Sequence, residues 1–191
     1  MKRLVSGLSI FVLGLMISSC ATGNSSITPD STVRFIVIDC PEEIRAKAVS
    51  YGKRYLERDT VYEWGGQDML EKEGELKLDC SGFIVNVFQY AVADTKYTLL
   101  FKDTTVGGLF ENFTISIDTP TPGDFIFMGA DPNAPTHMGI YLRTDEENIY
   151  FMDATQKDAE GIYPAVDGAT ERNYPKDDPR FLSYARLLIK Y

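Results

Sequence analysis

Histidine is the scarcest chemically useful residue in this chain, because His137 is the only one among 191 residues. A zinc site usually needs four histidine, cysteine or carboxylate ligands, with the cysteines at short spacing. The three cysteines, Cys20, Cys40 and Cys80, include no close pair. No glycine-rich phosphate loop is present either. We therefore expect neither a metal centre nor another cofactor.

Basic residues are also in short supply. The chain has 19 lysines and arginines against 28 acids, which gives a net charge of −9. Nucleic-acid binding needs clustered Lys and Arg to neutralise phosphates, so nucleic acid is not an expected partner. With 44% hydrophobic and 25% charged residues, the composition is that of an ordinary globular protein. The length suits one domain, which we expect to be a monomer.

Long apolar runs are confined to the N-terminus. Two basic residues precede an apolar run that ends near residue 17, which is the layout of a secretory signal and is too short for a good transmembrane helix. The sequence over 17–20, Ile-Ser-Ser-Cys, resembles the bacterial lipobox, which implies lipidation of Cys20 and a membrane anchor. A signal peptide with a chance cysteine is the alternative. The expected divisions are a signal over 1–19, a lipidated Cys20 with a flexible tether over 20–31, and a folded domain over 32–191.

The stretch Asp79-Cys80-Ser81-Gly82-Phe83 organises the rest of the chain. It opens a helical pattern of large apolar residues at 83, 84, 87, 88, 91 and 92. Asp79 is then the expected N-cap, and Cys80 lies in the first turn, where backbone N–H groups and the helix dipole favour a thiolate. Because the Asp79 carboxylate opposes this effect, a second positive group is needed. His137 is the only histidine that can supply it.

Cys40 has two possible roles. A disulfide between Cys40 and Cys80 would suit an exported protein and would abolish any thiol chemistry. A buried, inert Cys40 is the favoured alternative, because free cysteine packs well in protein cores.

Around the Cys80 helix, the sequence predicts an α+β fold. An amphipathic helix is expected over 41–58, with its tyrosine stripe in the core. Short apolar runs separated by turn signals then predict an antiparallel meander, closed by a strand at the end of the chain. The expected strands cover 125–128, 137–142, 148–153 and 181–189, with a short edge strand over 33–38. The polar stretches 67–77 and 156–180 are expected to be surface loops, and 95–118 receives no assignment.

A helix that carries a cysteine, followed by an antiparallel sheet that carries a histidine, is the arrangement of papain-like thiol hydrolases. The sequence resembles the NlpC-type cell-wall cysteine peptidases, also called the NlpC/P60 family. Four blocks carry the resemblance in the family's order, namely 62–66, 79–83, 122–125 and 137–141. The resemblance implies a papain-like fold, with N-terminal helices packed on a central antiparallel sheet and the catalytic cysteine at a helix N-terminus.

The resemblance also implies roles for individual residues. Cys80 matches the nucleophile and His137 the general base. Tyr62 matches a tyrosine whose hydroxyl lines the site and helps to stabilise the oxyanion, and the backbone N–H of Cys80 is the expected second donor. Asp79 and Ser81 match positions that hold the free amine and the backbone of the stem peptide's L-alanine.

The third polar residue of the site, after Cys80 and His137, departs from the family pattern. Relatives often place histidine in the strand after the catalytic histidine, whereas this chain has Asp153 there. A carboxylate bonded to the imidazole would fix its tautomer and stabilise the imidazolium, although Asp153 could instead satisfy only a backbone turn. Trp64 is a candidate substrate contact, with packing in the core as the favoured expectation. The loop over 67–77 is expected to edge the substrate groove.

The implied activity is hydrolysis of the peptide part of peptidoglycan, most specifically at the D-γ-glutamyl–diaminopimelate bond of the stem peptide. Amidase cleavage between muramic acid and L-alanine, or acyl transfer by the same residues, is the alternative within this class. A non-catalytic peptidoglycan-binding lipoprotein is the alternative from another class. The expected location is the cell envelope. The outer membrane is the expected anchor site, because Ala21 is not an acidic retention signal.

Overall fold

The computed structural model describes residues 35–161 and 163–191. The expected signal segment, Cys20 and the tether to residue 31 lie outside these residues. No helix in the described part of the chain is long and apolar enough to cross a membrane.

Two helices were expected and both are present. Helix α1 spans Glu42–Leu56 and helix α2 spans Cys80–Val92, each within two residues of the expected position. The helices pack on each other through Tyr55, whose ring meets the Phe83 ring edge-on at 5.8 Å. Tyr51 stacks on Tyr90 with 4.9 Å between ring centroids. The tyrosine stripe of α1 therefore packs in the core, as predicted.

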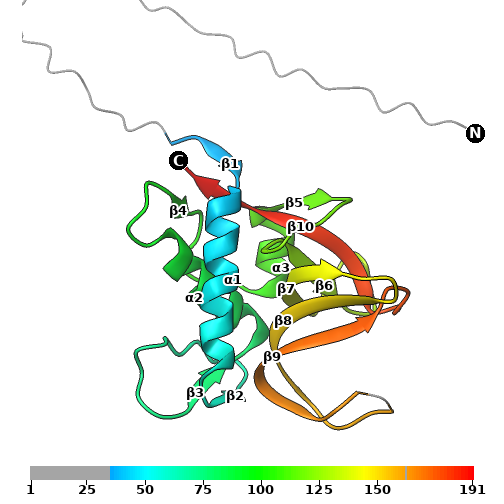
Figure 1. Ribbon diagram of the computed structural model, residues 1–191. Helices are drawn as coiled ribbons and strands as arrows, with labels where there is room; N and C mark the ends of the chain where they lie inside the picture. Colours follow the sequence, from blue (N-terminus) through cyan, green and yellow to red (C-terminus); the bar gives the residue numbers. More distant parts are fainter. Residues whose placement is uncertain (1–34, 162) are drawn as a thin grey trace, which may run out of the picture. The chain divides into compact units, whose positions relative to one another are not determined.

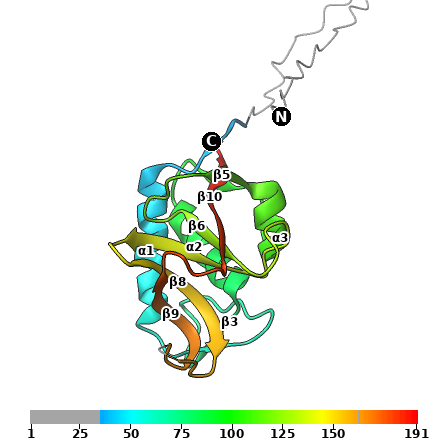
Figure 2. The ribbon, with the colours of Figure 1, turned by 90° about the vertical axis from the view of Figure 1, so that its right-hand side faces the viewer.

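The sheet is antiparallel and lies beside these helices (Figure 1). Its strand order is β1-β10-β6-β7-β8-β9, and the short strands β4 and β5 also pair with β10. Helix α2 packs against β7 and β8. Figure 2 shows the sheet side, with the long strands β8 and β9 facing the viewer. The strand bounds are β1 Val37–Asp39, β4 Thr98–Leu99, β5 Thr114–Ile117, β6 Phe125–Met128, β7 His137–Thr144, β8 Asn148–Lys157, β9 Val166–Pro175 and β10 Phe181–Lys190.

The expected meander and closing strand are confirmed, but the surface loop expected over 156–180 is wrong. Strand β8 continues to Lys157, and β9 pairs with it over ten residues. Strand β9 was missed because it is an edge strand whose residues are mostly polar or charged, so it lacks the apolar alternation that identifies a half-buried strand. This strand brings Arg172 beside Asp153.

Two other segments contain helical turns or strands that the sequence did not predict. The unassigned stretch 95–118 contains β4, the helical turns α3 (Val106–Gly108) and η1 (Leu109–Phe113), and β5. A parallel pair of short strands, β2 (Thr60–Tyr62) and β3 (Leu76–Leu78), brackets the expected loop. The loop is tied down at Asp68, whose carbonyl accepts hydrogen bonds from the Tyr55 hydroxyl (3.1 Å) and the Asn86 amide (2.9 Å).

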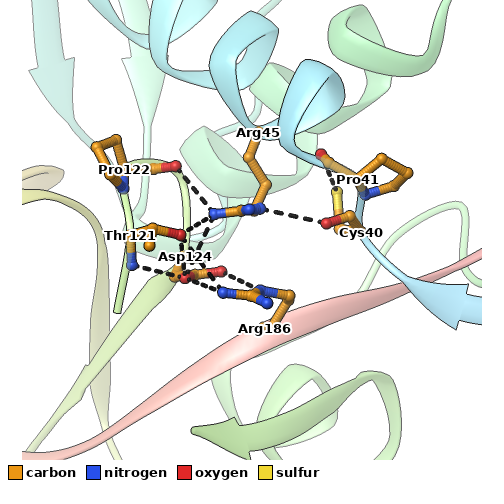
Figure 3. A network of polar contacts seen from close by, with 7 residues as sticks. All are labelled: Cys40, Pro41, Arg45, Thr121, Pro122, Asp124 and Arg186. Carbon is orange, nitrogen blue, oxygen red and sulfur yellow. Dashed lines mark hydrogen bonds and ion pairs between the residues drawn. The ribbon is translucent and has the colours of Figure 1, made fainter. Parts of the chain in front are cut away.

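A buried ion cluster joins the start of α1 to the sheet (Figure 3). The Asp124 side chain has no exposed surface and accepts hydrogen bonds from Arg186 at 2.8 Å through both Nε and Nη2. Arg45 Nη1 lies 3.5 Å from the same carboxylate, and Arg45 Nε donates to the Cys40 carbonyl at 3.2 Å. Although burial alone would raise it, the hydrogen bonds from Arg186 and Thr121 hold the pKa of Asp124 below its ordinary value.

Replacing Asp124 by asparagine is expected to destabilise the fold by about 3 kcal/mol, because the buried Arg45 and the partly buried Arg186 would lose their counter-charge. Since the folded-state pKa of Asp124 is lowered, its contribution is present at neutral pH and is lost as pH falls through that pKa. Chemical denaturation at pH 7 measures the loss. The control is Glu63→Gln in the half-exposed pair with Lys77, which should leave the midpoint unchanged. Equal midpoints for Asp124→Asn and wild type would contradict this account.

Candidate active site

Cys80 is the first residue of α2, and Asp79 is its N-cap, as the sequence predicted. Asp79 Oδ1 accepts hydrogen bonds from the Gly82 amide (2.6 Å) and from the Ser81 hydroxyl (3.0 Å). Its Oδ2 accepts one from the Gly65 amide (2.9 Å), so one carboxylate joins the glycine turn to the helix start. A Cβ on Gly82 would lie 2.1 Å from the Gly66 carbonyl oxygen, which explains why glycine stands two residues after the cysteine.

His137 is the first residue of β7, the strand that packs against α2. Its Nε2 lies 2.6 Å from Asp153 Oδ2, in the middle of β8. Burial alone would lower the pKa of His137, but hydrogen bonds that its ring donates to Asp153 and to the Cys80 sulfur raise it to about 9. The structure therefore brings the three predicted residues together. It also contradicts the alternative that Asp153 only satisfies a turn.

Arg172 completes this cluster and was not found from the sequence. Its Nε donates to Asp153 Oδ1 at 3.0 Å, its Nη2 donates to Oδ2, and its Nη1 donates to the Tyr174 hydroxyl. Asp153 is fully buried, which by itself would raise its pKa, yet His137 and Arg172 together hold the pKa of Asp153 below its ordinary value. The only signal was a charged residue in a polar stretch, which indicates a surface position rather than a buried ion pair.

A groove of about 450 Å³ opens onto Cys80, and we refer to it as the Cys80 groove. It is lined by residues 64–67, 79–82, 103–107, 135 and 136. The charged side chains of this lining are the carboxylates of Asp79 and Asp103. Of the long loop expected to edge the groove, Gln67 alone contributes to the lining. No cluster of side chains suited to a metal ion occurs in residues 35–161 and 163–191.

The other candidate residues also lie near this groove. Trp64 is 86% exposed, so the favoured expectation that it packs in the core is wrong, and it forms part of the groove wall. Ser81 lines the same groove. Tyr62 is partly buried, and its pKa is raised first by burial and then by the neighbouring Cys80 and Asp79. Tyr62 is not among the residues that line the Cys80 groove, so its predicted role at the oxyanion stays a prediction.

Both cysteines of the described residues have free thiols, so the alternative of a disulfide between Cys40 and Cys80 is wrong. Cys40 is buried beneath the start of α1, and burial raises the pKa of its thiol to about 12. The favoured expectation of a buried, inert Cys40 agrees with this environment.

The helix-borne cysteine, the strand-borne histidine and the antiparallel sheet define a papain-like α+β protein with a thiol–imidazole–carboxylate cluster. The sequence model of the NlpC/P60 family matches residues 59–170, and the chain belongs to that family. The matched range holds Cys80, His137 and Asp153 but ends before Arg172. The chain is also 35% identical over 83 residues to the "Probable peptidoglycan endopeptidase LytE" of Bacillus subtilis (strain 168). This match covers 44% of the present chain and 21% of the relative, so the chain spans about a fifth of that protein's length.

Proposed function

We propose that this protein is a cysteine endopeptidase that hydrolyses the peptide part of peptidoglycan. The observation that carries the proposal is the placement of Cys80 at the start of α2, in the wall of a groove and beside an imidazole held by Asp153. Membership of the NlpC/P60 family and the likeness to a probable peptidoglycan endopeptidase support the same class of reaction.

The chemistry follows from these positions. The Cys80 thiolate attacks the carbonyl carbon of the scissile amide, and the backbone N–H of Cys80 and the Tyr62 hydroxyl stabilise the oxyanion. The His137 imidazolium donates its proton to the leaving amine, and the tetrahedral intermediate collapses to a thioester. His137 then accepts a proton from the water that attacks the thioester. Collapse of this second tetrahedral intermediate releases the acid and restores the Cys80 thiolate and the His137 imidazolium. Asp153 stays ionised and keeps the imidazole oriented throughout.

The bond we propose is the D-γ-glutamyl–diaminopimelate bond of the stem peptide. Asp79 and Asp103 are the charged groups of the Cys80 groove, and they favour a substrate whose acyl part carries a free amine. Asp79 and Ser81 are the proposed contacts to that amine and to the adjacent backbone. Trp64 is the proposed substrate contact in the exposed wall of the groove. Amidase cleavage next to muramic acid and acyl transfer remain the alternatives on the same residues.

The proposed location is the cell envelope, because peptidoglycan lies there. The lipid anchor at Cys20, its place in the outer membrane and a monomeric state stay predictions from the sequence. Labelling with a radioactive fatty acid, with Cys20→Ala as the control, tests the anchor.

Mass analysis of muropeptides and of free stem peptides, whose L-alanine amine is not acylated by muramic acid, after incubation with the protein tests the proposed bond. We expect stem peptides to be shortened to L-alanyl-D-glutamate, with release of fragments that begin with diaminopimelate. Loss of the whole stem peptide from muramic acid would indicate the amidase, and transfer of the acyl group to an added amine would indicate acyl transfer. Unchanged muropeptides and unchanged free stem peptides, together with retention on sacculi, would favour the non-catalytic binding protein.

A further inference from the structure

A second cavity, of about 200 Å³, is lined by His137, and we call it the Lys157 cavity. Thr136 lines both spaces, so the two are adjacent. Cys80 lines only the groove, whereas His137 lines only the Lys157 cavity. The catalytic pair therefore stands at the boundary between two binding spaces.

The two spaces carry opposite charges. The ionisable lining of the Lys157 cavity consists of His137, Lys157, Arg172, Tyr174 and Arg180, and among the described residues no carboxylate lines it. The Cys80 groove has only carboxylates as charged lining. This contrast occurs in a protein of net charge −9, so the cationic cavity is not a reflection of the average surface. An adjoining cavity shares Lys157 and both arginines and adds Asp158, Glu160 and Glu171. The space lined by cations without a carboxylate is therefore the one that His137 also lines.

The Lys157 cavity also has hydrogen-bond donors left for a ligand. Lys157 is exposed and forms no ion pair with any residue that the structure describes. Arg180 uses Nε and Nη2 on Asp178, which leaves Nη1. The Tyr174 hydroxyl accepts a hydrogen bond from Arg172, so its own hydrogen can be donated. An ammonium, a guanidinium N–H and a phenol hydrogen are a donor set that suits a carboxylate.

We propose that the Lys157 cavity binds a carboxylate of the amino acid whose amine is released, and that Lys157 is the main contact. The inference rests on the proposed function. During cleavage the imidazole must reach the leaving nitrogen, so the leaving residue lies on the His137 side and the acyl part lies on the Cys80 side. A diamino acid with carboxylates at both ends, such as diaminopimelate, meets this requirement better than lysine, whose side chain ends in an amine alone.

The test compares peptides in which L-alanyl-γ-D-glutamate is joined to diaminopimelate, to lysine or to lysinamide. These leaving residues carry two, one and no carboxylates when released. Wild-type kcat/KM should be about 10-fold lower for the lysine peptide, the lysinamide peptide or both than for the diaminopimelate peptide. Lys157→Gln should reduce this preference to about 2-fold. Lys157→Arg, which keeps the charge, should retain most of the preference. Lys47→Gln makes the same charge change on the exposed face of α1 and should behave as wild type.

The outcomes separate this inference from the proposed function. If wild type cleaves none of the three peptides and leaves sacculi intact, the proposed function fails. If wild type cleaves them all with equal kcat/KM, or if Lys157→Gln keeps the full preference while denaturation shows it to be folded, the carboxylate site is refuted and the endopeptidase stands.

Discussion

Replacing Cys80 by alanine is expected to lower peptidoglycan hydrolysis by about 10⁴-fold or more, to the background of the assay. A residue that forms the covalent intermediate has no substitute, and loss of such a nucleophile removes the whole catalytic unit rather than one contribution. Release of soluble muropeptides from sacculi measures the effect. Thermal unfolding should show that the variant stays folded, because the substitution removes only one sulfur atom, from a side chain that lines the groove and is 5% exposed.

Cys40→Ala is the matched control for this experiment. Cys40 is buried with 2% of its surface exposed, and burial raises the pKa of its thiol to about 12, so it cannot act as a nucleophile near neutral pH. We expect this variant to hydrolyse sacculi at the wild-type rate, at some cost in stability. Alkylation by iodoacetamide should likewise modify Cys80 and spare Cys40. A Cys80→Ala protein that digests sacculi as well as wild type would remove the thiol mechanism altogether.

The residues nearest Cys80 could be predicted because their signals are local. Asp79 is an N-cap one residue before the helix, and Gly82 is required by the Gly66 carbonyl that packs on the same turn. Local interactions of this kind depend on a few residues that are adjacent in the sequence. His137 could be predicted as the partner of Cys80 because the chain has no other histidine.

The parts that were missed depend on contacts between distant segments. Arg172 contacts Asp153 only because β9 pairs with β8. Strand β9 is a polar edge strand, so its sequence lacks the apolar alternation by which a strand could be predicted. Trp64 was expected in the core on the basis of its large apolar area, but the turn at Gly65 leaves its ring in the groove wall. In both cases the tertiary arrangement, and not the local pattern, decides whether the side chain is buried.

Replacing Asp153 by asparagine is expected to lower kcat/KM by about 10²-fold or more and to move the high-pH limit of activity downward. Asparagine can still accept a hydrogen bond from His137, but it carries no negative charge. The pKa of His137 is about 9 in the wild type, so its imidazolium persists until pH rises through that value. Without the carboxylate the pKa should fall toward the ordinary value, and the loss of activity should be larger at pH 8 than at pH 6. A profile of kcat/KM between pH 5 and 10 measures both effects.

The neighbours of His137 give the direction of this shift. Cys80 faces it from α2 and Asp153 from β8, while Lys157, Arg172 and Arg180 line the Lys157 cavity together with His137. Once Asp153 is neutral, the cations oppose the imidazolium and only the thiolate supports it. If the high-pH limit of Asp153→Asn stayed near pH 9, the carboxylate would not be what stabilises the imidazolium, and its assignment would fail.

Arg172 separates an electrostatic role of Asp153 from a purely structural one. Arg172→Gln removes a cation beside the imidazole, so it should leave the high-pH limit in place or raise it, the opposite of the shift in Asp153→Asn. The free energy of unfolding tests the same pair of residues. Asp153→Asn strands the buried Arg172 charge, whose side chain is 8% exposed, at a cost of about 3 kcal/mol. Adding Arg172→Gln to that variant should restore part of the lost stability without restoring activity. Such non-additivity is expected only if the two side chains act as one buried ion pair that holds His137.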